Sequence, residues 1–367
     1  MQAHRRYTWR ILLLPFSLVY GLIIRLRNLL FDAGILPSAE FDLPVISVGN
    51  ISVGGTGKTP HVEYLVDLLK DDYAVATLSR GYKRKTRDFI LAANHSTVED
   101  IGDEPRQIKQ KYPDVMVAVD RRRVHGVQQL LKEQIPPDVI LLDDAYQHRY
   151  IKPGFSILLI DYNHPVNKDM LLPAGRLREP AGSRKRADII LVTRSPERMK
   201  PIERRQYVNN FGLELGQHLF FTSMVYDKIY PVFDIPDPSD LAHLKKNKPA
   251  ILIVTGIADP RGIRKFARSI STNIRAIAYP DHHAFSIKDI EQIDKAFRDL
   301  GSENVLILTT EKDAMRFHAV MVPDHLKKVL YQVRIKVRFL NDDTENFNKQ
   351  IIRYVTSNKR NSILHKK

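Results

Sequence analysis

The chain has 367 residues, of which 43% are hydrophobic, so it is long enough for about two domains with packed cores and is not a disordered protein. Lysine and arginine number 57 against 42 acidic residues, and the resulting net charge of +15 favours an anionic partner: a phosphorylated ligand, an anionic membrane surface or a nucleic acid. Cysteine is absent, which excludes disulfides and thiolate metal sites.

The first predicted element is an apolar helix, and we assign residues 1–35 to it. Residues Ile11 to Ile24 carry no charge and have arginines on both sides. A helix of that length covers about 21 Å, against ~30 Å of hydrocarbon in a bilayer, so we expect it to lie in the membrane interface rather than span it. No small-residue cleavage site follows, which disfavours a secretory signal. A helix packed on the protein's own core is the alternative, because Pro15 and Gly21 are not typical of an isolated surface helix.

Residues 49–60, which read GNISVGGTGKTP, lie between the apolar stretch Pro44–Val48 and the helix-like run Val62–Leu69. A strand, a glycine-rich loop and a helix start together predict a phosphate cradle, in which the lysine reaches the terminal phosphates and the threonine binds Mg²⁺. The strict motif has glycine where this chain has Ser52, but the other glycines still allow positive φ. A solvated Gly-Ser turn is the plain alternative. The predicted nucleotide-binding residues are Gly54, Gly55, Thr56, Gly57, Lys58 and Thr59.

Beyond the loop, short runs rich in valine and isoleucine alternate with helix-like segments. Continuous apolar runs suit a parallel sheet that is covered by helices on both faces. We therefore predict an α/β fold, a doubly wound and mostly parallel P-loop NTPase-like sheet, over residues 36–225. The predicted strands after the loop are Ala74–Leu78, Val115–Val119, Val139–Leu142, Ile157–Ile160 and Ile189–Val192.

The alternation stops at about Tyr226, where proline-rich sequence and a lysine cluster predict a linker or hairpin region over 226–249. It resumes with apolar runs that predict a smaller second α/β domain over 250–345. Residues 346–367 form a basic tail, and from Ser357 onward the tail lacks periodicity and is expected to fray. The predicted strands of the second domain are Ile251–Val254, Ile274–Ala278 and Val305–Leu308.

A pair of carboxylates, Asp143 and Asp144, directly follows the apolar run Val139–Leu142. The carboxyl end of a buried strand beside a phosphate loop is where P-loop enzymes hold the Mg²⁺ shell. Turns also recruit aspartate for local hydrogen bonds, but adjacent carboxylates repel unless a cation is near, and Mg²⁺ would supply it. Together with Lys58 and Thr59, the pair favours a metal and nucleotide site.

A second acidic pair, Asp103 and Glu104, lies between the second and third predicted strands. Such a pair is usually a solvated helix N-terminus. Arginines are dense around it, and near the strand ends they would form an anion-binding rim, although some must be ordinary surface charge. These arginines are Arg80, Arg84, Arg87, Arg121, Arg122 and Arg123.

Eight motifs in this order resemble those of the tetraacyldisaccharide 4'-kinase family, the membrane-associated lipid A kinases of Gram-negative bacteria. The motifs are GNISVGGTGKTP, SRGYKR (79–84), DEP (103–105), DDAYQHR (143–149), LLPAGRLREP (171–180), TGIADP (255–260), DHHAF (281–285) and TTEKDA (309–314). The resemblance implies transfer of the γ-phosphate of ATP, with Mg²⁺, to the 4'-hydroxyl of tetraacyldisaccharide 1-phosphate, giving lipid IVA. It also implies a peripheral location on the cytoplasmic face of the bacterial inner membrane.

The resemblance further implies a role for each matching residue. Asp103 would accept the proton of the attacking hydroxyl, assisted by His282 or, failing that, His283. Lys58 would neutralise charge on the phosphates, and Thr59 would ligate Mg²⁺. The metal and nucleotide shell would also include Glu104, Asp143, Asp144 and Gln147. Contacts to phosphates and lipid head group would come from Arg80, Tyr82, Arg123, Arg178 and Glu179, whose plain alternatives are surface charge, a core aromatic and a loop salt bridge.

One departure and two rival classes accompany the resemblance. Arg176 stands where the family often has a neutral residue, which adds a positive charge near the substrate. A membrane-cycling P-loop ATPase switch of the partitioning type usually has a lysine directly before the glycine pair, where this chain has Val53. A nucleic-acid-binding P-loop protein is suggested only by the net charge, and no recognition motif supports it. We therefore expect a lipid partner, no nucleic acid and no protein partner.

Overall fold

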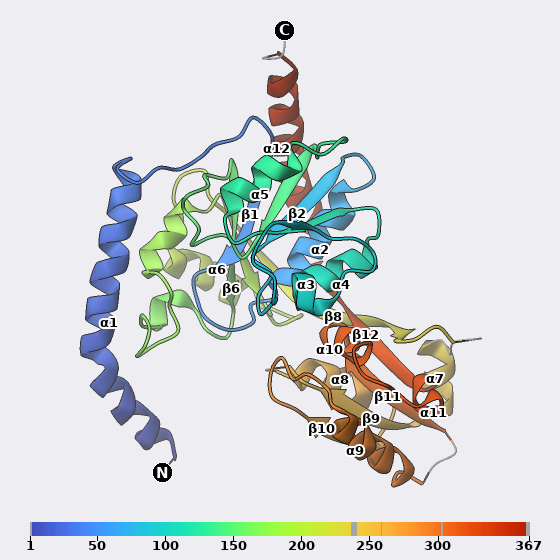
Figure 1. The fold of residues 1–367 in the computed structure, drawn as a ribbon. Helices are drawn as coiled ribbons and strands as arrows, with labels where there is room; N and C mark the ends of the chain where they lie inside the picture. The colour runs from blue at the N-terminus through green and yellow to red at the C-terminus, as the bar shows by residue number, and fades with distance from the viewer. Residues whose placement is uncertain (1, 236–240, 258, 302–303, 365–367) are drawn as a thin grey trace. The chain divides into compact units, whose positions relative to one another are not determined.

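The computed structural model describes residues 2–235, 241–257, 259–301 and 304–364. The chain divides into two compact units, one made of Met1–Met224 with Val337–Lys367 and the other of Val225–Lys336. It passes from the first unit to the second within strand β8 (His218–Pro231) and returns within strand β12 (Leu330–Phe339), as Figure 1 shows. The second unit is therefore an insertion into the first.

The first unit contains a mostly parallel sheet with strand order β8-β7-β6-β1-β5-β2-β4-β3. Its pairs are parallel except β3 with β4, and β1 lies between β5 and β6. The predicted α/β class is confirmed, and each strand predicted in this unit exists to within two residues. The strands are β1 (Val45–Asn50), β2 (Val75–Ser79), β3 (Ile90–Leu91), β4 (Met116–Val119), β5 (Val139–Asp143), β6 (Phe155–Asp161) and β7 (Ile189–Thr193).

Alternate residues of these strands face two separate cores, as the period of a strand requires. Ile46 belongs to the core that α2 (Lys58–Leu69) covers, and Val45 belongs to the core that α5 (Arg123–Leu130) covers. Burial on both faces explains why the strands read as continuous apolar runs rather than as alternating ones. Further helices of this unit are α3 (Val98–Ile101), α4 (Asp103–Lys111) and α6 (Pro201–Phe211), with 3-10 turns at Val166–Lys168 and Ala181–Arg186.

The C-terminal segment forms helix α12 (Thr344–Leu364), whereas the sequence predicted a basic tail over 346–367 that frays from Ser357. Phe347, Ile351 and Val355 recur every four residues and are buried in the core that α2 covers. The tail prediction is therefore wrong for 346–364, because basic residues on the outer face obscured an apolar stripe. Its last three residues, 365–367, lie outside the described part of the chain.

The predicted linker region 226–249 is replaced by regular structure at both ends. Strand β8 continues to Pro231, and α7 (Leu241–Asn247) contains Lys245 and Lys246 of the cluster in its last turn, where basic side chains favour a helix C-terminus. Residues 236–240 of the proline-rich stretch lie outside the described residues. The second unit thus begins at Val225, with no separate linker before it.

The second unit contains its own sheet, in the order β10-β9-β11-β12-β8. The pairs among β9, β10, β11 and β12 are parallel, and alternate β9 residues Ile251 and Ile253 pack in a core with Phe266 of α8. The smaller α/β unit predicted here is present, between 225 and 336. Its elements are β9 (Ala250–Thr255), α8 (Arg261–Arg268), β10 (Ile274–Ala278), α9 (Ile287–Arg298), β11 (Val305–Thr310), α10 (Glu311–Phe317) and α11 (Asp324–Lys327).

Helix α1 (Gln2–Asp32) is longer than the uncharged stretch from which it was predicted. In the described part of the chain, the 21 residues Leu12–Asp32 have a mean hydropathy of 1.4 and pass a test of length and composition for crossing a membrane. The argument that the helix is too short to span is therefore wrong, because the helix continues through the flanking arginines. A signal sequence passes the same test, so hydropathy does not define how the helix meets a membrane.

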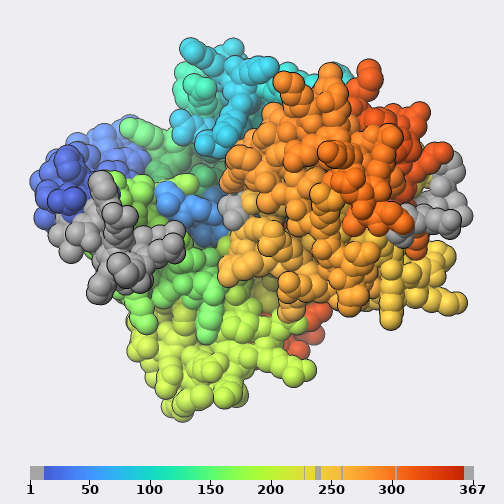
Figure 2. Space-filling view, turned by 90° about the horizontal axis from the view of Figure 1, so that it is seen from below, coloured from blue at the N-terminus to red at the C-terminus, as the bar shows by residue number. Residues whose placement is uncertain are grey.

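One side of α1 is anchored to the first unit by hydrogen bonds. The Tyr20 hydroxyl donates to the main-chain oxygen of Arg178 at 2.8 Å, and the Arg27 guanidinium donates to that of Gln147 at 2.8 Å. Phe31 is buried near the end of the helix. The other side is an exposed apolar surface. Helix α1 is the dark blue segment of the space-filling view in Figure 2. The residues of the exposed surface are Leu12, Phe16, Leu18, Val19, Leu22, Ile23, Leu26 and Leu29.

Candidate active site

The glycine-rich loop connects the carboxyl end of β1 to the first turn of α2, as predicted. Gly54 and Gly57 have φ values of 104° and 83°, a region that glycine enters without strain. A Cβ on Gly57 would lie 2.2 Å from the methyl group of Met224, which would have to move, and the positive φ would strain any larger residue there. Lys58 and Thr59 are the first two residues of α2, where main-chain N–H groups lack partners within the helix. This geometry suits the binding of phosphate oxygens.

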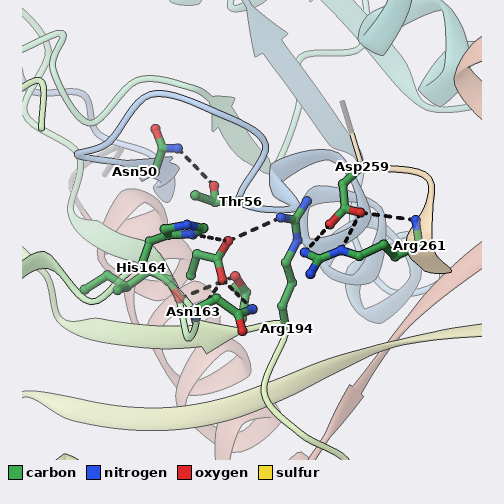
Figure 3. Close-up of polar contacts among 10 residues, drawn as sticks. Asn50, Thr56, Asn163, His164, Arg194, Asp259 and Arg261 are labelled. Carbon is green, nitrogen blue, oxygen red and sulfur yellow. Dashed lines mark hydrogen bonds and ion pairs between the residues drawn. The ribbon is translucent and has the colours of Figure 1, made fainter. Parts of the chain in front are cut away.

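Two neighbouring segments brace the loop. The Asn50 side-chain amide donates to the Thr56 hydroxyl at 3.0 Å across the loop (Figure 3), and both side chains are buried. On the other side, the Val53 N–H donates to the main-chain oxygen of Arg176 at 2.8 Å. Ser52, at the position where the strict motif has glycine, forms an isolated bridge with Leu177. The loop is therefore held in place before any ligand binds.

The carboxylate pair lies directly beside this loop. Val48 of β1 is in register with Asp143 of β5, and the Asp144 N–H donates to the Val48 oxygen at 2.9 Å. Lys58 Nζ lies 3.2 Å from Asp144 Oδ1, and Arg178 lies 3.5 Å from Asp144 Oδ2. Burial opposes ionisation of Asp144, but the two cations outweigh it and hold its pKa below the ordinary value. Parallel pairing of β1 and β5 thus brings lysine and carboxylate together at one sheet edge.

Asp143 has a different environment from its neighbour. Its side chain is 5% exposed, and its Oδ1 atom has no hydrogen-bond partner. Burial, reinforced by the negative charge of Asp144, raises the pKa of Asp143 to about 7. An unpartnered buried carboxylate oxygen beside a phosphate loop is a donor suited to a hard cation. The described residues hold no cluster of three or more His, Asp or Glu side chains at metal-binding spacing. Mg²⁺ requires only one or two protein carboxylates, because phosphates and water complete its shell.

The second acidic pair, Asp103 and Glu104, begins helix α4. Close main-chain contacts at Gly81 and Gly102 bring the start of this helix against the SRGYKR segment. A Cβ on Gly102 would lie 2.9 Å from the Tyr82 main-chain oxygen, and one on Gly81 would lie 2.8 Å from the Ile101 oxygen. Asp103, which follows Gly102, is 7% exposed. The charge of Glu104 also raises the pKa of Asp143, which indicates that the two carboxylates face one region. Arg80 and Tyr82 are exposed on this rim.

Three predicted ligand residues are largely committed to contacts within the protein. Arg123 is 2% exposed, and it donates to the Asp120 oxygen at 2.8 Å, while burial lowers its pKa to about 10. Glu179 is fully buried and pairs with Arg186 at 2.7 Å, which is the loop salt bridge that the sequence left open. The Gln147 side-chain amide donates to the Asn50 oxygen at 2.6 Å. These side chains support the site from behind rather than lining an open surface.

The histidines of the DHH segment lie in the second unit. His283 Nε2 lies 3.0 Å from Asp289, and its ring stacks on Tyr279 with centroids 4.5 Å apart. His282 has a φ of 62°; its Nδ1 lies 3.3 Å from an Arg316 nitrogen, and its Nε2 lies 3.9 Å from Asp281. His283 is held by a hydrogen bond and a ring stack within its own unit, and the choice of His282 as the assisting histidine stays a prediction.

Sequence reasoning missed three residues around the loop. Asn50 is described above. Arg194, labelled in Figure 3, directly follows β7; it pairs with Asp161 at 3.2 Å, and its guanidinium lies 3.6 Å from where a Cβ on Gly55 would be. Burial lowers the pKa of His61 in α2 to about 4. A polar residue at the carboxyl end of a parallel strand is the available signal for Asn50 and Arg194.

Comparisons with known proteins agree with this geometry. The model of the family described as tetraacyldisaccharide-1-P 4'-kinase matches residues 9–356. The chain belongs to that family. A tetraacyldisaccharide 4'-kinase of Phocaeicola vulgatus is 48% identical over 95% of this chain and 96% of its own length, and one of Flavobacterium johnsoniae is 43% identical over 95% and 98%. The crystal structure of LpxK from Aquifex aeolicus in complex with ATP is 31% identical, with a TM-score of 0.72 over 95% of this chain and 99% of that one.

Membership confirms the predicted family, its kinase activity in lipid A biosynthesis and its α/β fold. It does not favour the partitioning-type ATPase.

Proposed function

We propose that this protein transfers the γ-phosphate of ATP to the 4'-hydroxyl of tetraacyldisaccharide 1-phosphate, producing lipid IVA. The observation that carries the proposal is the position of Lys58 at the start of α2, 3.2 Å from Asp144 at the end of the neighbouring parallel strand. A lysine held in that way can move from its carboxylate to the terminal phosphates of ATP. Family membership supplies the acceptor.

Some residues of the site bind the nucleotide, and others act on the acceptor. Main-chain N–H groups from Gly54 to Thr59 bind the phosphates, and Lys58 neutralises charge that develops during transfer. Asp103 takes the proton of the attacking hydroxyl, and His282 in the second unit assists it. Arg178 and Arg80 bind anionic groups at the rim. Arg123 and Glu179 hold the loops that carry these groups.

Mg²⁺ fits the oxygen donors beside the loop. Thr59 and Asp143 would hold the ion, and Asp144 and Glu104 would act directly or through water. The bound ion would supply charge neutralisation between the phosphates. Asp143 carries an otherwise unpaired Oδ1 atom, which a cation would satisfy. Gln147 is an orienting residue in this arrangement, because its amide already bonds to Asn50.

The exposed side of α1 attaches the enzyme to the cytoplasmic face of the inner membrane, where a lipid acceptor is accessible. The exposed leucines bury in the acyl region, and the positively charged protein is attracted to anionic lipids. The inner side of the helix hydrogen-bonds to the main chain at Arg178 and Gln147, so the membrane anchor is fixed to the segments that form the site.

A labelling assay tests the proposed function. The purified protein, with ATP labelled at the γ-phosphate, Mg²⁺ and detergent-dispersed tetraacyldisaccharide 1-phosphate, is expected to label the lipid. The same lipid with its 4'-hydroxyl methylated is the matched control and should remain unlabelled. Release of inorganic phosphate without any labelled lipid would contradict the proposal and indicate an ATPase.

The membrane role of α1 makes a separate prediction. Leu18, Leu22 and Leu26 lie on one face, with exposures of 73%, 68% and 55%. Replacing all three with Glu is expected to weaken binding to anionic vesicles by about a hundredfold or more, because apolar burial is lost and negative charge is added. Co-sedimentation with vesicles measures it.

Leu215→Glu is the control for that prediction, because Leu215 is fully exposed elsewhere in the first unit. It should leave vesicle binding unchanged, and ATP binding should be equal in both variants. Undiminished sedimentation of the triple variant would remove the membrane role of this surface.

A further inference from the structure

His61 is a buried histidine behind the phosphate loop that the mechanism above does not use. It lies in the first turn of α2, three residues after Lys58, and is 3% exposed. Its ring nitrogens both have partners: Nδ1 lies 2.8 Å from the Gly57 main-chain oxygen, and Nε2 lies 3.0 Å from the Thr222 hydroxyl. The imidazole therefore connects the loop to β8.

The direction of these hydrogen bonds follows from the chemistry of their ends. The Gly57 carbonyl can only accept, so Nδ1 must carry the proton that is donated to it. In a neutral imidazole Nε2 is then the acceptor, and the Thr222 hydroxyl donates to it. The order of donation is thus Thr222 to His61 to Gly57. Burial means that water does not substitute for either partner, so loss of one bond leaves a buried polar group unsatisfied.

The orientation of the Gly57 carbonyl determines that of the Lys58 N–H, which points in the opposite direction. The peptide between Gly57 and Lys58 is planar, so the direction of the Gly57 oxygen sets that of the Lys58 N–H. The main-chain bond from the His61 N–H to this oxygen is long, 3.4 Å, whereas the ring bond is 2.8 Å. The imidazole is therefore the closer support of a peptide whose N–H lies at the helix N-terminus, where phosphate binds.

Strand β8 contacts both Gly57 and the imidazole that holds the Gly57 oxygen. Thr222 and Met224 are two residues apart, so their side chains point to one face of the strand. The Met224 methyl group occupies the space where a Cβ on Gly57 would be, and Thr222 holds the imidazole. The chain leaves the first unit at Val225, directly after these residues. The end of the phosphate loop thus rests on the strand through which the chain enters the second unit.

We propose that His61 is a positioning residue for ATP: through the hydrogen bonds from Thr222 and to Gly57, it orients the Gly57–Lys58 peptide so that the Lys58 N–H faces the phosphates. The inference rests on the proposed use of this loop for ATP. In this arrangement His61 holds the loop from its buried side, whereas Asn50 connects the two ends of the loop through its hydrogen bond to Thr56.

The test measures ATP affinity by calorimetry, without lipid, in four variants. The double variant His61→Leu with Thr222→Val removes the imidazole and its hydroxyl partner together, so neither side chain is left unpaired, and the Gly57 oxygen keeps the 3.4 Å main-chain bond from residue 61. It is expected to weaken ATP binding about tenfold, the effect of one lost hydrogen bond or slightly more. His61→Asn places an amide N–H near the position of Nδ1, and it should retain affinity to within about threefold. Thr222→Ser keeps the hydroxyl and should match the unaltered protein. Asn247→Leu is the distant control.

The kinetic readout separates positioning from stability. In the double variant KM for ATP should rise by the same factor as its dissociation constant, while KM for the lipid stays within about twofold. Rescue by His61→Asn distinguishes a hydrogen bond to Gly57 from mere filling of space. Unchanged ATP affinity in the double variant, or equal losses in His61→Asn and the double variant, would overturn the inference. A protein that binds ATP but labels no lipid would instead contradict the proposed function, and the His61 test would still stand.

Discussion

Asp103→Asn is expected to lower kcat by about a thousandfold, because an amide cannot accept the proton of the 4'-hydroxyl. Asn has nearly the same shape as Asp, so the start of α4 and its packing at Gly102 should be preserved. ATP affinity, measured by calorimetry, should stay within about twofold, because the phosphate loop is a separate segment. The assay is lipid labelling at saturating ATP and lipid.

The neighbouring carboxylate provides the control. Glu104→Gln removes one negative charge from the same first turn of α4, so any effect of the helix N-terminus on stability is common to both variants. A loss of activity in Glu104→Gln that depends on Mg²⁺ concentration would fit its place in the metal shell, whereas added Mg²⁺ should not rescue Asp103→Asn. Equal turnover by Asp103→Asn and unaltered protein would eliminate Asp103 as the base.

The fold was predictable where local sequence and burial agree. Strands β1, β5 and β7 are buried on both faces, so each is a continuous run of apolar residues bounded by polar ones. Strands β8 and β12 were missed because they belong to two units and mix apolar with charged residues along their length. Helix α12 was missed for a similar reason: three buried residues suffice to dock it, and the basic residues between them dominate the composition.

The site was predictable to the extent that it is local in sequence. The carboxyl ends of parallel strands meet at one edge, so an apolar run followed by Asp143 and Asp144 points to the same place as the run before the loop. Burial of Glu179 depends on Arg186 and on chain segments that sequence does not relate to it. His61 depends on Thr222, 161 residues away. His282 was identified by resemblance alone, because no spacing links the second unit to the loop.

Asp143→Asn is expected to abolish most activity and, at the same time, to stabilise the protein in the absence of metal. Activity should fall about a hundredfold or more, because a ligand that suits Mg²⁺ is lost. The free energy of unfolding at pH 8 without Mg²⁺ should rise by about 2 kcal/mol, because a pKa unit corresponds to about 1.4 kcal/mol and an unpaired amide offsets part of the gain. Lipid labelling and urea unfolding in EDTA measure the two effects.

The sign of the stability effect follows from the pKa of Asp143, which burial and Asp144 raise from 3.8 to about 7. As pH rises above about 4, the unfolded chain releases this proton while the folded protein retains it, so the unaltered protein loses stability until pH reaches about 7. Asn has no proton to release. Its advantage should therefore be absent below pH 4, grow between pH 4 and 7, and stay constant above pH 7.

Asp161 at the end of β6 is the matched control, because hydrogen bonds from Asn163 and His164 and the charge of Arg194 outweigh its burial and lower its pKa. Asp161→Asn should therefore destabilise the protein at pH 8, the opposite sign to Asp143→Asn. Added Mg²⁺ with ADP should raise the unfolding free energy of the unaltered protein and of Asp161→Asn, but not that of Asp143→Asn, because only a ligand that binds the folded state stabilises it. If Asp143→Asn destabilises the metal-free protein at pH 8, Asp143 is a structural carboxylate and the cation site lies elsewhere.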